Sequence, residues 1–166
     1  MNGLAQIVST FAGTGYLRPA PGTWGSLVAL PMAWGLHLIG GFPVLLIASI
    51  AVFFVGWWAT IVMTRGQADH DPSEIVIDEV AGQWIALLPL SYGASRMGVD
   101  ITALWPGWIA AFVMFRLFDI IKPGPIGWAD RRNDAFGVML DDVIAGVFAA
   151  LCVLGMAAFA HGVFAV

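Results

Sequence analysis

The chain has 166 residues, of which 60% are hydrophobic and only 11% are charged, and its mean hydropathy is +0.86. A soluble domain has roughly 45–50% apolar and about 25% charged residues, so a soluble domain of this size is excluded. The formal net charge of −4 includes no basic run, which argues against a nucleic-acid partner. The only cysteine, Cys152, excludes an intramolecular disulfide and lies in an apolar run that gives it a packing role. We therefore expect one integral membrane domain over residues 1–166.

The first quarter of the chain predicts a short surface helix, a loop and a helical hairpin. Residues 1–16 lack the basic start of a cleaved signal and read as a surface helix. Residues 13–23 contain three Gly and two Pro, which predicts a loop. Apolar stretches follow at residues 25–39 and 43–64, with Gly40, Gly41 and Pro43 as the turn. The first stretch is only about 22 Å long as a helix, short of a hydrocarbon core of about 30 Å.

A polar segment, residues 65–74, precedes the next apolar stretch. Asp71 is placed as an N-cap, Pro72 suits the first helical position, and Glu74 completes a capping box. We expect this helix to run through Asp78 and Glu79 to Leu90. Residues 91–100 are then predicted to form a loop.

The last third of the chain predicts two further apolar helices. Residues 101–118 form one, with Trp105 and Trp108 placed like interfacial anchors. Residues 120–142 are polar and turn-rich, and residues 143–159 form the final apolar helix, directly after Asp141 and Asp142. The predicted fold is an all-α polytopic membrane bundle with four to five membrane helices.

Charged residues gather on one side of this topology. If the chain crosses the bilayer five times from the cytoplasm, all basic residues except Arg96 fall on or near the cytoplasmic face, as the positive-inside tendency predicts. All acidic residues except Asp100 share that face, although the tendency does not require it. We therefore predict a polar site there, built from Arg18, Arg65, Arg116, Lys122, Arg131, Arg132, Asp69, Asp71, Glu74, Asp78, Glu79, Asp119, Asp130, Asp134, Asp141 and Asp142.

Acidic pairs next to apolar stretches are the strongest chemical signal. Asp69 and Asp71 are adequately explained as helix caps. The pairs Asp78-Glu79 and Asp141-Asp142 are not, because a capped helix needs one acid and an unpaired charge near lipid costs several kcal/mol. Close carboxylates need a cation between them, and oxygen ligands favour Mg²⁺, Mn²⁺ or Ca²⁺ over Zn²⁺.

A second signal is the Gly/Pro loop before the first apolar stretch. Its glycines, Gly22 among them, let backbone N–H groups approach an anion, and the helix that follows adds partial positive charge. Arg18, Thr23 and Ser26 would complete a phosphate cradle. Lys122, the only lysine, is either a snorkelling anchor or a phosphate contact.

Missing motifs narrow the possible mechanisms. The sequence has no cysteine-phosphatase loop, Walker loop, aspartyl-nucleophile motif, serine elbow or CDP-alcohol phosphotransferase pattern. Direct attack by a metal-activated water remains.

Four blocks of the sequence resemble the phosphatidylglycerophosphatase A family, in the family's order and across nearly the whole chain. They are APGTWGS at residues 20–26, DPSEIVIDEVAGQ at 71–83, FRLFDIIKP at 115–123 and MLDDVIAG at 139–146. The resemblance implies a Mg²⁺-dependent phosphatase of the bacterial inner membrane. Its reaction would remove the terminal phosphate of phosphatidylglycerophosphate, at the cytoplasmic face and without an obligate protein partner.

On this hypothesis the acidic pairs and three of the basic residues have roles at the site. Mg²⁺ would be held by Asp78, Glu79, Asp141 and Asp142, with Glu74 and Asp119 as further ligand or general-base candidates. Developing charge would be stabilised by Arg18, Arg116 and Lys122. Residues 129–136 (ADRRNDAF) depart from the Gly-rich turn expected there, so Asp130 and Asp134 receive no role. The alternatives are a small ion transporter or channel, with acids at its cytoplasmic mouth, and a non-catalytic membrane subunit.

Overall fold

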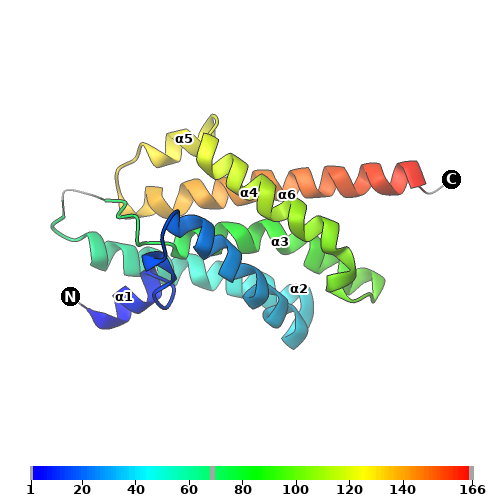
Figure 1. Ribbon diagram of the computed structural model, residues 1–166, viewed down its shortest axis with the longest axis horizontal. Helices are drawn as coiled ribbons and strands as arrows, with labels where there is room; N and C mark the ends of the chain where they lie inside the picture. Colours follow the sequence, from blue (N-terminus) through cyan, green and yellow to red (C-terminus); the bar gives the residue numbers. More distant parts are fainter. Residues whose placement is uncertain (1, 68–69, 165–166) are drawn as a thin grey trace.

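The computed structural model describes residues 2–67 and 70–164, and the only regular secondary structure in these ranges is helical (Figure 1). This confirms the all-α prediction. Asp69, one of the predicted caps, lies outside the described residues.

The chain begins with a short helix and a single 3₁₀ turn. Helix α1 (Gly3–Ser9) is capped by Asn2, whose side chain accepts a hydrogen bond from the Leu4 N–H at 3.2 Å. The 3₁₀ helix η1 (Thr14–Tyr16) lies inside the predicted loop. That loop ends earlier than expected, because Pro21, with its fixed φ, occupies the first turn of the next helix.

Helix α2 (Pro21–Thr64) is 44 residues long and is sharply bent at Gly40 and Gly41. Gly41 has φ 64°, which a residue with a side chain rarely adopts. The bend divides α2 into two arms, residues 21–39 and 42–64, that run in opposite directions (Figure 1). The predicted hairpin is therefore confirmed. Because the first arm starts at Pro21, it is about 28 Å long, close to the hydrocarbon thickness of about 30 Å.

Helix α3 (Ile77–Met97) differs from its prediction at both ends. It starts at Ile77, not at Pro72, because the Val76 N–H donates to the distant Ser9 carbonyl at 2.9 Å. The predicted capping box at Asp71 and Glu74 is therefore wrong. The predicted loop over residues 91–97 is also wrong: the helix continues to Met97 and ends at Gly98, which has φ 64°.

The remaining elements are η2 (Ile101–Leu104), α4 (Trp105–Ile121), α5 (Pro125–Asp130) and α6 (Ala135–Phe164). Helix α6 begins eight residues before the predicted start at residue 143. Asp134 precedes its first turn and accepts a hydrogen bond from the Gly137 N–H at 2.6 Å, as an N-cap does. Asp141 and Asp142 are therefore inside the helix and not ahead of it, which corrects the prediction.

Among the described residues, three segments are long and apolar enough to cross a membrane: α2, residues Ile101–Ile121, and Ala135–Ala160 of α6. They mark the chain as a membrane protein. With the two arms of α2 counted separately there are four apolar passes, and α3 is a fifth long helix packed against α2 and α6. This agrees with the predicted four to five membrane helices.

Small residues let α3 lie very close to α6. A Cβ on Gly82 of α3 would clash with the Asp142 carbonyl of α6, and one on Gly146 would clash with the backbone of Gly82. On its other side α3 is tied to α2 by Trp84, whose indole N–H donates to the Ala29 carbonyl at 2.9 Å. Close packing through small residues is typical of membrane helices. It brings the start of α3 next to the second turn of α6.

The element ends separate into two groups (Figure 1). The starts of α2, α3 and α6 and the end of α4 lie together, near α5, at the left of the view. Arg96 and Asp100 belong to the opposite end, where α3 passes into η2. The gathering of the other charged residues at one end of the bundle was expected from the sequence.

Candidate active site

Three carboxylates form the centre of the polar end. One oxygen of each of Asp78, Glu79 and Asp142 lies within 4.8 Å of the others. Asp78 and Glu79 come from the first turn of α3, and Asp142 from the second turn of α6. Asp78 is only 7% exposed and Asp142 only 3%. The sequence predicted that these residues from two distant blocks would meet.

These carboxylates cannot all remain ionised without a compensating cation. Asp142 also lies within hydrogen-bonding reach of the Asp119 carboxyl group, which comes from the last turn of α4. Buried like charges at this separation repel one another, and an uncompensated buried charge costs several kcal/mol. A shared proton or a bound cation must therefore lie among them.

Arg116 is the cation closest to this cluster in the described part of the chain. Its Nη1 atom lies 2.5 Å from Asp119 Oδ2 and 4.0 Å from Glu79 Oε1. The buried Glu79 Oε2 and Arg116 Nε atoms have no hydrogen-bond partner among residues 2–67 and 70–164. A buried carboxylate oxygen without a donor, beside two further carboxylates, suits a hard divalent cation. Asp78, Glu79 and Asp142 thus fit a metal site, although oxygen ligands alone do not identify the metal.

Lys122 forms a second group at the same end of the bundle. Its Nζ atom bonds to Asp141 Oδ2 at 2.7 Å and to Asp130 Oδ1 of α5. Partial burial alone would lower the pKa of Lys122, but these two bonds outweigh it and raise the pKa above its ordinary value. Asp141, predicted as a metal ligand, is therefore paired with Lys122 and lies outside the three-carboxylate group. Asp130, which received no role from the sequence, is the second partner of this lysine.

The Gly/Pro loop packs directly against the acidic segment, as its proposed complementarity requires. A Cβ on Gly22 would overlap the Glu79 carboxylate, and one on Gly15 would overlap the Glu74 backbone. Arg18 Nη1 donates to Ser73 Oγ at 3.2 Å, so this exposed guanidinium lies over the same segment. The start of α2, the start of α3 and Arg116 of α4 therefore converge at Glu79.

Other predicted ligands lie near the cluster without joining it. Ser26 is fully buried and donates its hydroxyl to the Gly22 carbonyl at 2.9 Å, which stabilises the first turn of α2. Thr23 lies half-buried in that turn, and Glu74 lies half-buried ahead of α3. Their roles as phosphate or metal ligands stay predictions.

Sequence reasoning gave no role to Gln83. It is fully buried, and neither atom of its amide group has a hydrogen-bond partner in the described residues. It lies four residues after Glu79, which places both side chains on the same face of α3. The four-residue spacing from Glu79 was the one feature of the sequence that could have indicated a role for Gln83 at the site.

Comparison with known proteins agrees with the geometry. The pattern of the Phosphatidylglycerophosphatase A family matches residues 7–157, which include every residue of the two charged groups. The chain belongs to the phosphatidylglycerophosphatase A family. It is therefore an enzyme of the phosphatase class, and the resemblance found in the sequence is confirmed.

Relatives of this family member match it over most of their length. A phosphatidylglycerophosphatase A of Haemophilus influenzae is 34% identical over 145 residues, 87% of this chain and 83% of that protein. One of Escherichia coli is 35% identical over 140 residues, 83% of this chain and 74% of that protein. A protein of Bacteroides thetaiotaomicron named as a candidate phosphatidylinositol-3-phosphatase is 35% identical over 150 residues, 87% of this chain and 88% of that protein. No solved structure matches this chain significantly.

Family membership also bears on the alternatives drawn from the sequence. A transporter, a channel or a non-catalytic subunit would not require membership of a phosphatase family. Family membership therefore favours the enzymatic interpretation over these alternatives.

Proposed function

We propose that this protein hydrolyses the terminal phosphate of phosphatidylglycerophosphate, giving phosphatidylglycerol and phosphate, at the cytoplasmic face of the bacterial inner membrane. The observation that carries the proposal is the meeting of Asp78, Glu79 and Asp142 within 4.8 Å. Arg116 and the start of α2 lie at the same point. Phosphomonoester hydrolysis by a metal-activated water uses both a hard cation and anion-binding groups.

Mg²⁺ is the proposed cofactor, held by Asp78, Glu79 and Asp142. When bound, it would lower the pKa of water and neutralise phosphoryl oxygens. Support comes from the all-oxygen donor set and from the buried Glu79 oxygen that lacks a partner in the described part of the chain. Asp141 contributes through Lys122, which fixes α6 against α5, rather than as a direct ligand.

The chain's own residues bind and orient the phosphate. Arg116 lies beside Glu79 and Asp119, where its guanidinium can stabilise charge on the phosphoryl oxygens. The first-turn N–H groups of α2 add partial positive charge near Gly22. Arg18, exposed on the neighbouring loop, is placed to attract the headgroup phosphate from the membrane surface.

Asp119 is the proposed general base. It is paired with Arg116 at 2.5 Å and lies near Asp142, so it lies between the anion-binding group and the carboxylate cluster. A carboxylate there can accept the proton of an attacking water, while the leaving glycerol oxygen takes up a proton from solvent at the polar end.

The location of the site suits a lipid substrate. The apolar helices hold the bundle in the bilayer, and the charged groups lie together at one end of it. A phospholipid can therefore keep its acyl chains in the membrane while its phosphomonoester reaches the carboxylates.

Phosphate release by the purified protein in detergent micelles tests this function. The substrate is phosphatidylglycerophosphate, compared with phosphatidylinositol-3-phosphate and phosphatidic acid, each with Mg²⁺ and with excess EDTA. We expect Mg²⁺-dependent release, fastest from phosphatidylglycerophosphate. Asp142→Asn should be inactive, whereas Asp100→Asn, at the opposite end of the bundle, should match the wild type. Faster release from phosphatidylinositol-3-phosphate would overturn the proposed substrate, and full activity in EDTA would overturn the metal site.

A further inference from the structure

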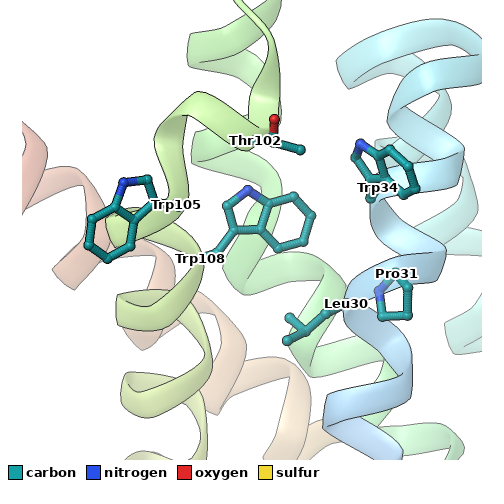
Figure 2. Close-up of a pocket in the computed structure, with 6 residues that line it drawn as sticks. All are labelled: Leu30, Pro31, Trp34, Thr102, Trp105 and Trp108. Carbon is teal, nitrogen blue, oxygen red and sulfur yellow. The ribbon is translucent and has the colours of Figure 1, made fainter.

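An apolar groove lies between α2 and α4. Its volume is about 300 Å³ and its walls are Leu30, Pro31, Trp34, Thr102, Trp105 and Trp108. Figure 2 shows Trp34 and Trp108 facing one another across it, with Leu30 and Pro31 below them. It exists because α2 and α4 touch each other little while both pack on α3.

One wall of the groove is held in place by a hydrogen bond. The Trp108 indole N–H donates to the Ile101 carbonyl at 3.0 Å, which holds the ring in position. Next to Trp108 in the chain, Gly107 of α4 lies against the Leu90 side chain of α3, which holds the two helices close together. Because this side of the groove is ordered before a ligand enters, binding loses little side-chain entropy.

The same two helices that carry the groove also carry the headgroup site. Leu30 lies eight residues after Gly22 on α2, and Trp108 lies eight residues before Arg116 on α4. At 1.5 Å per residue, both are about 12 Å from the phosphate-binding groups, and Trp34 is about 18 Å away. One leaflet of the hydrocarbon core is about 15 Å thick. If the phosphate occupied the carboxylate cluster, the distal part of an acyl chain, away from the headgroup, would therefore lie at the depth of the groove.

We propose that this groove binds the distal part of one acyl chain of the lipid substrate and so makes the enzyme sensitive to chain length. The inference rests on the proposed function, because it uses a phosphomonoester at Glu79 and Arg116 as the fixed end of the lipid. Lipid tails are as apolar as the groove, so an acyl chain gains no hydrophobic free energy by entering it. What the chain gains is van der Waals packing against the tryptophan rings. The expected effects are therefore moderate.

The test compares long-chain and short-chain phosphatidylglycerophosphate, dioleoyl and dihexanoyl, in mixed micelles. Trp34→Ala should lower kcat/KM for the dioleoyl substrate about threefold to tenfold, through lost packing contacts, and leave the dihexanoyl substrate unchanged. Trp58→Ala is the matched control. Trp58 lies on the other arm of α2, away from the groove, and is 39% exposed against 42% for Trp34.

A second variant fills the groove instead of widening it. Leu30→Trp should reduce turnover of the dioleoyl substrate and spare the dihexanoyl one. If both Trp34→Ala and Leu30→Trp match Trp58→Ala on both substrates, the groove proposal is overturned while the proposed function stands. If Trp34→Ala changes the oligomeric state by light scattering and affects both substrates equally, the groove is a contact between copies and the proposal is again overturned. Wild-type protein that releases no phosphate from either substrate would overturn the proposed function itself.

Discussion

Gly22 lies against the carboxylate of Glu79, so closely that a Cβ on Gly22 would overlap Glu79 Oε1 and approach Arg116 Nη1 to 3.2 Å. This contact joins the first turn of α2 to the first turn of α3 at the centre of the proposed site. Because the neighbouring atoms are the ends of flexible side chains, an added methyl group would displace the carboxylate and leave the backbone in place.

Gly22→Ala is therefore expected to reduce activity without unfolding the protein. A displacement of catalytic groups by about 1 Å can lower the rate about 100-fold. Phosphate release and thermal unfolding in detergent should be measured together. Gly35→Ala is the control, because Gly35 lies on the same arm of α2 and its Cβ would meet nothing within 4 Å. Equal activity of the two variants would show that the Glu79 position is not critical.

Replacing a carboxylate of the cluster should separate metal binding from folding. Asp142→Asn removes one of three close negative charges, so the metal-free protein should be at least as stable as the wild type. Activity should fall at least about 100-fold, the upper end for groups around a metal. Mg²⁺ at 100 times its dissociation constant stabilises a protein by about 2.7 kcal/mol. We therefore expect Mg²⁺ to raise the unfolding temperature of the wild type but not that of Asp142→Asn. An equal rise in both proteins would place the metal elsewhere.

Lys122 tests whether the link between α4, α5 and α6 is needed to hold the site together. Lys122→Met leaves Asp141, which is nearly buried, without its cation. We expect a loss of about 1–3 kcal/mol in the free energy of unfolding, kept moderate because the Lys122 side chain is 28% exposed. Lys122→Arg retains the charge and should recover most of the stability. Denaturation of both variants in detergent provides the measurement.

The pH dependence of this difference follows from the raised pKa of Lys122. A lysine in the unfolded chain has a pKa of about 10.4, and the bonds to Asp130 and Asp141 raise the folded value above it, against the effect of burial. The stabilisation by charged Lys122 is therefore complete below the pKa that the lysine has in the unfolded chain. It is lost only as the pH rises through the pKa that the lysine has in the folded protein. The stability difference between wild type and Lys122→Met should therefore not decrease as pH rises from about 6 to 9. A difference that shrinks within this window would contradict the assigned pairing.

Much of the site could be predicted because its residues lie in dense local patterns. The pair Asp78-Glu79 and the pair Asp141-Asp142 each adjoin apolar runs, and Arg116 and Asp119 are three residues apart. These patterns place charged residues at the ends of membrane helices. Helix ends on the same side of the membrane then lie close together in the folded bundle. The bend at Gly40 and Gly41 was likewise visible as a local break.

What the sequence could not supply depends on contacts between distant segments. The start of α3 is set by the bond from Val76 to Ser9, which outweighs a favourable capping sequence at Asp71. The division of roles between Asp141 and Asp142 arises from helical geometry, because adjacent residues on α6 point about 100° apart. One therefore reaches Lys122 and the other reaches Asp78, a distinction that composition and spacing do not contain.

Gln83 offers a test of whether the site retains polar groups at the expense of stability. A buried amide without partners costs about 1–3 kcal/mol, and both amide atoms of Gln83 lack partners in the part of the chain that the structure describes. Gln83→Leu has a similar volume and should therefore raise the unfolding temperature. If the amide orients Glu79 or the phosphate one helical turn away, the same variant should lose activity, a trade-off common at functional sites. Gln67→Leu, at an exposed position whose side chain bonds only locally to Met63, is the control. A stabilised Gln83→Leu protein with full activity would reduce Gln83 to a packing residue.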